Sequence, residues 1–436
     1  MANDILDNGR IILTYGRSII SLAIAHSLGK RGVEVIGCDD VDMTVLQFSK
    51  FVSKTFTHRP QHTDAEGFIE DLVAAAEKFH PGDDRPYVLI PAFRDATLIA
   101  RHRERLEATG IVVAAPPIEA IEAVLSKAAF AKTAQAHGLP VPTTVIVESE
   151  DELCDAEFPE PAIVKPRDSH GGRGIRVCQT REEAISYARE LASDGGEWPV
   201  VQSVEPGEDY CFAALCDHGK IVAHMAYRNL QQFPIDSGAG VVRETVDDSK
   251  LLPAAEKLLA AVGWHGVGQI DFRWDGEGEP VLIEVNPRFW AGLVHSMESG
   301  VDFPWLLYQV ILGRDVDPEP VDEGARTKTP GLSWLAALQE SIDSNESFEE
   351  LGKVWDEFKG ELESRDWEQA WRSFQKLMTT EIHTTPTMER WRTLNGESEY
   401  AHSDLLLDED PQAALGMLFV VSSLARHGEL PPELKG

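Results

Sequence analysis

Short apolar runs alternate with stretches of helical spacing along the first part of the chain. Ile11–Leu13 has the continuous apolar character of a buried strand, and Ile19–Leu28 has the spacing of a helix. The run VEVIGC predicts a second strand, and residues 87–106 repeat the change from strand to helix. With a further strand in GIVVAAP (110–116), the pattern predicts a doubly wound α/β domain over residues 1–120.

The pattern changes twice after this first domain. Strands and helices continue to alternate up to residue 315, which predicts a second domain over residues 121–315. The stretch 313–331 combines proline, glycine and charge without any period, and it predicts a linker. The remaining residues are rich in tryptophan and have helical spacing, so residues 316–436 are predicted as a linker followed by a helical C-terminal region.

A lysine and a glycine loop lie between two predicted strands in PAIVKPRDSHGGRGIRVC (161–178). The strand Ala162–Val164 delivers Lys165, and the loop HGGRG follows. Glycines let backbone N–H groups curl around phosphate oxygens, and a nearby lysine adds positive charge. Because the spacing is not GxxxxGK[ST], the loop is predicted as a flap over phosphates. An ordinary glycine-rich hairpin is the alternative.

An apolar run leads into a Pro–Gly turn and two acids in WPVVQSVEPGEDYCFAAL (198–215). Backbone groups along such a segment can pair with the amine and ring nitrogen of a purine. A carboxylate beyond the turn, from Glu208 or Asp209, can hold ribose hydroxyls. A hairpin with solvated acids is the alternative here.

Oxygen donors lie on two adjacent strands of a predicted hairpin over residues 266–290. Asp271 lies on the first strand, and Glu284 and Asn286 are two residues apart on the second, hence on one face. Hard oxygen donors suit Mg²⁺, which fills its remaining positions with water and nucleotide phosphates. Arg288, further along, can hold an anionic substrate or a phosphoryl oxygen. A salt-bridged exposed face is the alternative, and the apolar neighbours disfavour it.

These segments, in this order, resemble the ATP-grasp superfamily, in its carboxylate–amine ligase and carbamoyl-phosphate-synthase-like branch. The resemblance covers residues 10–315 and leaves the helical tail unmatched. It implies a Rossmann-like pre-ATP-grasp domain at the front. It also implies that residues 121–315 form an ATP-grasp domain of two α+β subdomains, with a glycine-loop lid over residues 140–205.

The resemblance further implies a set of residues that bind the nucleotide. Phosphate-binding residues would be two lysines and the loop, namely Lys127, Lys165, His170, Gly171, Gly172 and Gly174. Adenine-binding residues would be those of the hinge, namely Val201, Gln202 and Val204. The family often has glutamate where Gln202 stands. Asp209 would bind the ribose by its spacing from the hinge, with Glu208 as the second choice.

Metal and catalytic roles follow in the same way from the resemblance. Asp271, Glu284 and Asn286 match the family's magnesium ligands. Arg288 matches the arginine that steadies the transferred phosphate or the acyl phosphate. Arg243, in GAGVVRET, occupies the place of a second arginine, and with Lys165 these two are the predicted catalytic residues.

Charge and cysteine content limit the partners and the location. The 436 residues carry 73 acidic and 40 basic side chains, a net charge of −33, which argues against unassisted binding to nucleic acid or an anionic membrane. Acids scattered along the whole chain are typical of a protein adapted to high salt, and an acidic mesophilic enzyme is the alternative. Five cysteines without a CxxC pair predict buried thiols in a reducing cytoplasm.

No segment is predicted to cross or enter a membrane. The first ten residues lack a basic-then-apolar signal pattern, and no uncharged run reaches the ~18 residues that a span needs. The apolar run GMLFVVSSL (416–424) is predicted as a buried helix instead.

The sequence therefore predicts a cytoplasmic enzyme that uses ATP and Mg²⁺, with Mn²⁺ as a substitute. It would join a small-molecule carboxylate to an amine through an acyl phosphate. A phosphotransferase with the same nucleotide site and a non-catalytic ATP-binding subunit are the alternatives. A homo-oligomer is left open. A dinucleotide at the front domain is a further alternative, with only Gly16 in the first turn and with Asp39 and Asp40 at the end of the second strand.

Overall fold

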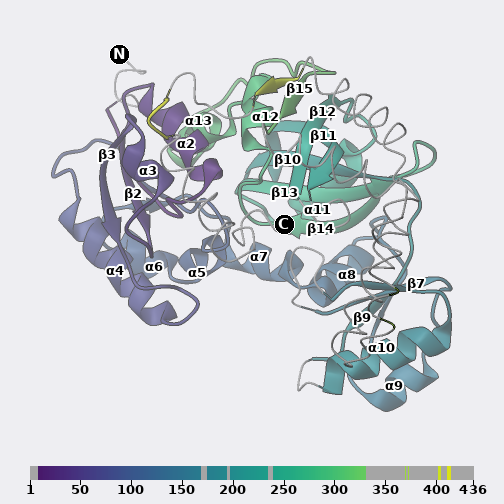
Figure 1. The fold of residues 1–436 in the computed structure, drawn as a ribbon. Coiled ribbons are helices and arrows are strands. Elements are labelled where there is room, and N and C mark those ends of the chain that lie inside the picture. The colour runs from purple at the N-terminus through teal and green to yellow at the C-terminus, as the bar shows by residue number, and fades with distance from the viewer. Residues whose placement is uncertain are drawn as a thin grey trace.

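The computed structural model describes residues 8–167, 174–193, 197–233 and 239–329, with residues 369, 372, 401–403 and 410–413. Within this part of the chain the strands form three sheets, of five, seven and four strands. The five-stranded front sheet and the large sheet lie side by side in Figure 1, and the small sheet projects below the large one.

The front sheet is entirely parallel and has the order β3-β2-β1-β4-β5. Its strands are β1 (Arg10–Leu13), β2 (Glu34–Asp39), β3 (Val52–Thr57), β4 (Tyr87–Ile90) and β5 (Val112–Val113). Their nearly continuous burial along β1, β2 and β4 is what a parallel sheet covered on both faces requires. The predicted doubly wound architecture is therefore confirmed.

Helices cover this sheet and connect it to the rest of the chain. They are α2 (Ile19–Gly29), α3 (Val45–Phe48), α4 (Ala65–Lys78), α5 (Ala96–Arg101), α6 (Arg103–Glu107), α7 (Ile118–Leu125) and α8 (Lys127–Ala136). The side chain of Ser18 caps α2 by accepting the Ile20 N–H, and Ser126 caps α8 by accepting the Ala129 N–H. The Ser126 cap ends α7 and starts α8, which places Lys127 at the first turn of a new helix.

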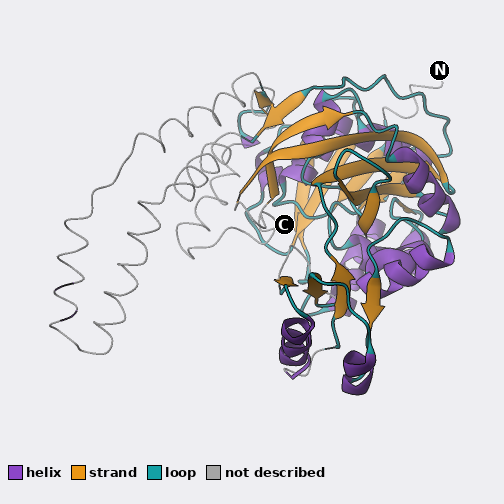
Figure 2. Ribbon diagram, turned by 90° about the vertical axis from the view of Figure 1, so that its right-hand side faces the viewer, coloured by secondary structure: helices purple, strands orange, loops and turns teal. Residues whose placement is uncertain are grey.

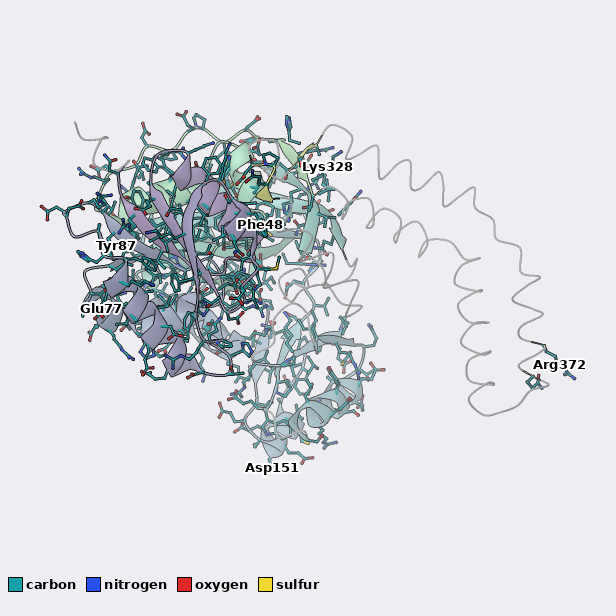
Figure 3. All side chains as sticks on the ribbon, turned by 60° about the vertical axis from the view of Figure 1, so that its left-hand side comes forward. Phe48, Glu77, Tyr87, Asp151, Lys328 and Arg372 are labelled. Carbon is teal, nitrogen blue, oxygen red and sulfur yellow. The ribbon has the colours of Figure 1, made fainter. Side chains whose placement is uncertain are left out.

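The small sheet has the order β6-β9-β7-β8 and is antiparallel throughout. Its elements are β6 (Thr144–Ile146), α9 (Glu150–Asp155), β7 (Ala162–Lys165), β8 (Arg176–Cys178), α10 (Arg181–Ser193) and β9 (Val200–Ser203). Helix α10 packs on β7 and β8. In Figure 3, Asp151 on α9 marks the end of this unit that lies away from the large sheet. The sheet carries Lys165 at the end of one strand and the predicted hinge on another.

The large sheet is built on long antiparallel strands, which cross the upper part of the molecule in Figure 2. Its order is β14-β13-β10-β11-β12-β15-β16. The strands are β10 (Glu208–Asp217), β11 (Lys220–Phe233), β12 (Ala239–Val246), β13 (Gly266–Trp274), β14 (Val281–Asn286), β15 (Arg326–Lys328) and β16 (His402–Ser403). The helices are α11 (Leu252–Ala261), α12 (Leu293–Glu298) and α13 (Phe303–Ile311).

The front sheet and the large sheet share a hydrophobic core. One cluster of buried side chains contains Ile11 and Leu13 of β1 together with Ala213 of β10 and Tyr308 of α13. Helix α2 packs on α13, and Arg31 beyond α2 forms an ion pair of 2.8 Å with Asp302. The loops at the carboxyl edge of the front sheet are therefore held at a fixed position relative to the large sheet.

Two expectations from the sequence are wrong. The predicted linker 313–331 contains β15, which pairs with β12 and carries Arg326 beside Glu244. A strand of three residues is too short to show a period, so the sequence pattern missed it. Of the five cysteines, Cys154 is exposed rather than buried, because it lies at the end of the short helix α9. The other four thiols are buried, as predicted, and all five are free.

The predicted helical region and the run 416–424 lie almost wholly outside the described residues. Among the helices that are described, none combines the length and apolar character that crossing a membrane demands.

A pH dependence of stability is expected from His224 on β11. Its Nδ1 lies 2.6 Å from Asp248 Oδ2, just before α11, and this hydrogen bond raises the pKa of the imidazole. A raised histidine pKa stabilises the fold below the unfolded value of about 6.5 and loses that effect as the pH rises through the folded value. His224→Gln should therefore lower the unfolding free energy by about 1 kcal/mol at acidic pH, since partial exposure screens the pair.

Urea unfolding of wild type and His224→Gln in mildly acidic and in mildly alkaline buffer measures this effect. The difference should shrink at the alkaline pH, and His137→Gln, at an exposed position after α8, serves as the control. A destabilisation that is the same at both pH values would contradict a charged His224–Asp248 pair.

Candidate active site

The three predicted metal ligands converge at the edge of the large sheet. Asp271 on β13 and Glu284 on β14 are directly opposite each other in the antiparallel pair. The side-chain amide of Asn286 donates to Asp271 Oδ2 at 3.2 Å and lies 3.5 Å from Glu284 Oε1. Gln269 Nε2 donates to the other oxygen of Asp271 at 2.8 Å. The two carboxylates thus face one another across adjacent strands.

The electrostatics of this group fit a divalent cation. Burial, and then the neighbouring charge of Glu284, raise the pKa of Asp271 well above its usual value. Two carboxylates this close repel each other unless a proton or a cation lies between them. Two carboxylates and an amide oxygen are hard donors, which Mg²⁺ prefers. The two carboxylates therefore fit the ion that the sequence predicted, whereas Asn286 presents its amide nitrogen to Asp271 and its oxygen to Arg288, so its amide would turn over to bind the same ion.

A row of polar side chains continues across the sheet from these acids. Cys211 on β10 is opposite Asp271 on one side and opposite Tyr227 of β11 on the other. Burial and the charge of Asp271 raise the pKa of the Cys211 thiol well above its usual value, so the thiol is protonated. This row could not be predicted from the sequence, because it depends on the register of β10 between β11 and β13.

Arg288 connects the metal strand to the front sheet. Its Nη2 donates to Asn286 Oδ1 at 3.1 Å, and its guanidinium carbon lies 4.4 Å from the centroid of the Phe93 ring. Burial, and then the charge of Arg94, lower the pKa of Arg288 to about 10, against the opposing charges of Asp271 and Glu284. The side chain remains cationic at neutral pH and lies between the acids and the loop after β4.

Lys165 faces the same acids from the small sheet. It is the last residue of β7, and it is buried, with 8% of its surface exposed. Burial lowers the pKa of its ammonium group, the charge of Glu284 opposes this shift, and the charge of Lys127 adds to it. The negative charge of Asp209, like that of Glu284, favours the charged ammonium group and so opposes the lowering of its pKa. Charged residues from α8, β7, β10 and β14 therefore lie near enough to one another to interact electrostatically.

The predicted hinge and ribose residues have partners within the protein. Val201 is buried in β9, and Val204 beyond it is exposed. The side chain of Gln202 is buried and donates to Thr144 Oγ1 at 2.8 Å. Asp209 pairs with Arg273 at 2.7 Å, and Glu208 pairs with Arg228 at 3.0 Å.

These contacts limit how the hinge can bind a base. The Gln202 amide is turned toward β6, so backbone groups remain the natural donors and acceptors for an adenine. Both acids are exposed, and each is held by an arginine in a position that a ligand can reach.

Arg243 lies on β12 next to the polar row. It is buried and donates to the carbonyl of Gly240. Burial raises the pKa of Cys211 and of Tyr227 well above their usual values, and the positive charge of Arg243 opposes both shifts. A Cβ on Gly292 would lie 2.8 Å from the Tyr227 hydroxyl and 3.2 Å from Arg243 Cδ. The absence of a side chain at Gly292 is therefore what lets Arg243 and Tyr227 pack together.

The glycine loop is described only at its end. His170, Gly171 and Gly172 lie outside the described residues. Gly174 has a φ of +69°, and its carbonyl accepts the Tyr187 hydroxyl at 3.0 Å. A side chain at this position would be strained by the positive φ and would meet Pro166 Cγ at 2.9 Å.

The acids at the end of β2 bind a side chain of the protein itself. Arg17 forms ion pairs with both Asp39 and Asp40, and its backbone N–H donates to Asp39 Oδ2 at 2.8 Å. Asp39 is buried. The carboxylate that a ribose would need is therefore taken by Arg17, which disfavours a dinucleotide at the front sheet.

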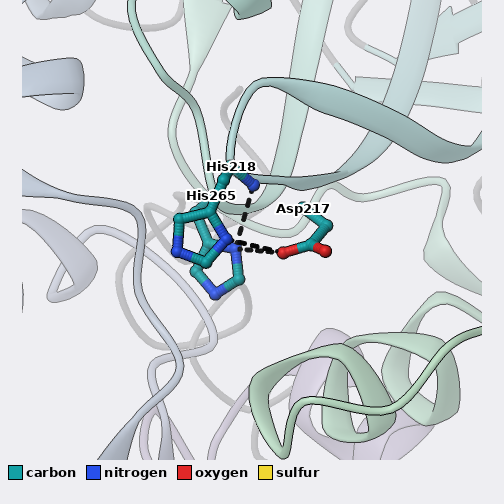
Figure 4. Close-up of side chains that lie close together, drawn as sticks. All are labelled: Asp217, His218 and His265. Atoms are coloured by element: carbon teal, nitrogen blue, oxygen red, sulfur yellow. Dashed lines mark hydrogen bonds and ion pairs between the residues drawn. The ribbon is translucent and has the colours of Figure 1, made fainter.

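A second group of side chains of the types that can bind metals lies at the opposite end of β10 from Asp209. Asp217 Oδ1 is 2.7 Å from His218 Nδ1 and 3.4 Å from His265 Nδ1, at the turn between β10 and β11 (Figure 4). The backbone N–H of His218 also points to His265 Nδ1, at 3.3 Å. Hydrogen bonds within the group account for this arrangement, and it lies apart from the predicted site.

Comparisons with known proteins agree with this architecture. Residues 200–330 match the family described as ATP-grasp in the biosynthetic pathway with Ter operon. The carbamoyl phosphate synthase large chain of Hyperthermus butylicus is 28% identical over 253 residues, which cover 54% of this chain and 24% of that protein. The chain thus spans about a quarter of the length of this curated relative.

Solved structures show the same fold. A biotin carboxylase–β,γ-ATP complex from Campylobacter jejuni superposes with a TM-score of 0.59 at 19% identity, over 72% of this chain and 74% of that one. The L-amino acid ligase from Bacillus licheniformis superposes with a TM-score of 0.52 at 17% identity, over 72% of this chain and 75% of that one. At such identities the likeness concerns the fold alone.

Proposed function

We propose that this chain, whose fold is that of the ATP-grasp enzymes, is an ATP- and Mg²⁺-dependent ligase that joins a carboxylate to an amine through an acyl phosphate. The predicted resemblance to the ATP-grasp superfamily and its carbamoyl-phosphate-synthase-like branch is confirmed by the family match and by the relatives. The ligase reaction, its small-molecule substrates and a cytoplasmic location are the proposal.

One observation carries the proposal above the others. Asp271 and Glu284 face each other across β13 and β14, and Lys165 of the small sheet interacts electrostatically with Glu284. A cation held by the acids and a lysine on the opposite side are what a triphosphate requires between two sheets. The solved biotin carboxylase complex contains β,γ-ATP, and the amino acid ligase has the same fold, which supports this interpretation.

The residues of the chain would act mainly by position and charge. Bound Mg²⁺ supplies neutralisation of the phosphate oxygens, and Asp271, Glu284 and Asn286 would hold it. Lys165 and Lys127 would bind phosphate oxygens from the other side. Arg288 would hold the anionic oxygens of the reacting acid during attack on the γ-phosphate.

The second half-reaction requires an amine and the exclusion of water. The amine would displace phosphate from the acyl phosphate and form a C–N bond, with no side-chain nucleophile. Cys211, the thiol nearest the acids, is protonated, which agrees with a direct reaction. Closure of the small sheet over the large one would protect the acyl phosphate from hydrolysis.

The test is a coupled ADP assay on the whole chain with panels of acids and amines, at low and at molar KCl, with mass spectrometry of the products. We expect ADP release that depends on an acid and reaches its full rate only with an amine, with an amide as product. Hydroxylamine should trap the acyl phosphate as a hydroxamate. A stable phosphorylated product without an amine would support a phosphotransferase instead, and ATP binding without any turnover would support a non-catalytic subunit.

A further inference from the structure

Three side chains at one end of the large sheet bring metal-binding atoms together, away from the candidate active site. Asp217 ends β10, His218 lies in the turn to β11, and His265 stands immediately before β13. One donor atom from each residue, a carboxylate oxygen or an imidazole nitrogen, lies within 4.8 Å of the other two. Figure 4 shows both rings turning a nitrogen toward the carboxylate of Asp217. We call these three residues the turn triad.

The backbone holds the turn triad in place. His218 and Gly219 have φ values of 48° and 86° and form the two-residue turn between β10 and β11. The Gly219 N–H donates to the carbonyl of Trp264, directly before His265, at 2.6 Å. Trp264 itself is fully buried. The two histidines therefore lie on chain segments that are bonded to each other and anchored in the core.

Two hydrogen bonds hold the triad together, and a third contact joins two acceptors. His218 Nδ1 donates to Asp217 Oδ1 at 2.7 Å. The His218 backbone N–H donates to His265 Nδ1 at 3.3 Å, so this nitrogen presents a lone pair. The same nitrogen lies 3.4 Å from Asp217 Oδ1, which also presents lone pairs. A cation beside these two atoms would turn an unfavourable contact into a favourable one.

The distances suit an ion that is bound by nitrogen and oxygen. Zn²⁺ lies about 2.0–2.2 Å from such ligands, which places two ligands of a tetrahedral ion about 3.4 Å apart. Asp217 Oδ1 and His265 Nδ1 already have this separation. The His218 ring must move outward by about 0.7 Å and open from its angle of 31° to the His265 ring. Its side chain is 81% exposed, so it has room for this movement.

Two imidazoles and a carboxylate favour a transition metal over Mg²⁺. Imidazole nitrogen suits Zn²⁺, Cu²⁺ and Ni²⁺, whereas Mg²⁺ prefers oxygen ligands. The pair Asp271 and Glu284 is the opposite case, because its donors are oxygens only. The net charge of −33 attracts cations to the protein in general. The two sites would therefore take different metals from the same solution.

We propose that Asp217, His218 and His265 form a second metal site, which binds Zn²⁺ or a similar transition-metal ion with water in the remaining position. The ion connects the turn between β10 and β11 to the residue that leads into β13, and so stabilises this end of the large sheet. The site goes beyond the proposed ligase reaction and does not depend on it.

The experiment measures Zn²⁺ binding while Mg²⁺ occupies the carboxylate pair. ZnCl₂ is titrated by calorimetry into the untagged whole chain, which is first treated with EDTA and then held in saturating MgCl₂. Electron paramagnetic resonance of bound Cu²⁺ counts the coordinating nitrogens. The variants are His265→Gln and His218→Asn, since asparagine tolerates the positive φ of the turn. His62→Gln, which removes an exposed imidazole before α4, is the control.

We expect a single Zn²⁺ to bind to each chain under these conditions, and Cu²⁺ to couple to two nitrogens. Each variant should weaken Zn²⁺ binding at least about 100-fold, because losing a ligand costs at least as much as losing a residue that only orients one. His62→Gln should stay within about twofold of the wild type. Zn²⁺ should raise the melting temperature of the wild type and of His62→Gln, and leave that of both variants unchanged.

Several outcomes would overturn the second metal site. They are no Zn²⁺ binding in the presence of Mg²⁺, an affinity that His265→Gln and His218→Asn leave unchanged, and an equal loss in His62→Gln. A Cu²⁺ spectrum without two coupled nitrogens would overturn it as well. Melts without Zn²⁺ show whether each variant is folded, and one folded variant is enough for the test, because the two histidines lie in different connections of the sheet.

Discussion

Replacing Glu284 with alanine should lower ADP formation by about a thousandfold or more, because the metal loses one of its two carboxylates and the phosphate charge is no longer neutralised. The fold should survive, since Glu284 lies at the edge of the large sheet and is only partly buried. Removal of this carboxylate also relieves its repulsion with Asp271. Steady-state ADP release with saturating acid and amine, together with a thermal melt, measures both effects.

Glu279→Ala is the matched control for this variant. Glu279 is an exposed acid in the turn between β13 and β14, so its loss changes the net charge equally without touching the site. Its rate should remain that of the wild type. Activity of Glu284→Ala within a few-fold of the Glu279→Ala value would contradict the metal assignment.

The second large effect is expected at Lys165. Lys165→Met should weaken ATP binding about 10- to 100-fold, since a charge-assisted hydrogen bond of about 1.5–3 kcal/mol to the phosphates is lost. Burial already lowers the pKa of this ammonium group, so an apolar side chain of similar length suits the site in the absence of nucleotide. The melting temperature without ATP should therefore be equal to or above that of the wild type.

Calorimetric titration of ATP in the presence of Mg²⁺ measures this change. Lys132→Met, at an exposed position on α8, is the control, because it removes a charge from the same region without facing the acids. An unchanged ATP affinity in Lys165→Met, or an equal loss in Lys132→Met, would exclude Lys165 as a phosphate ligand.

Most strands and helices of the front sheet could be predicted from the sequence pattern. Its strands are buried on both faces, so Ile11–Leu13 appeared as a continuous apolar run, and β1 spans Arg10–Leu13. Helix α2 appeared through its spacing and ends at Gly29, close to the predicted boundary. β15 could not be predicted, because three residues are too few to show a hydrophobic period. Its pairing partner, β12, is also distant in the sequence.

The sequence predicted those parts of the site whose residues lie close together along the chain. Glu284 and Asn286 share a face because they are two residues apart on one strand, and Asp271 meets them through a short hairpin. The contact of Arg288 with Phe93 joins residues almost two hundred positions apart, and a single sequence contains no signal for it. The same holds for Cys211 and Tyr227, which join the row only through the register of three long strands.

The most direct measurement of the central claim is ATP binding with and without a divalent cation. Calorimetric titrations of the wild type and of Glu284→Ala would be run in Mg²⁺, in Mn²⁺ and in EDTA. The wild type should bind ATP tightly with either cation and at least about tenfold more weakly in EDTA, and the variant should lose most of this difference. Equal affinity of the wild type in Mg²⁺ and in EDTA, or the same cation dependence in the variant, would contradict a nucleotide held through Asp271, Glu284 and Asn286.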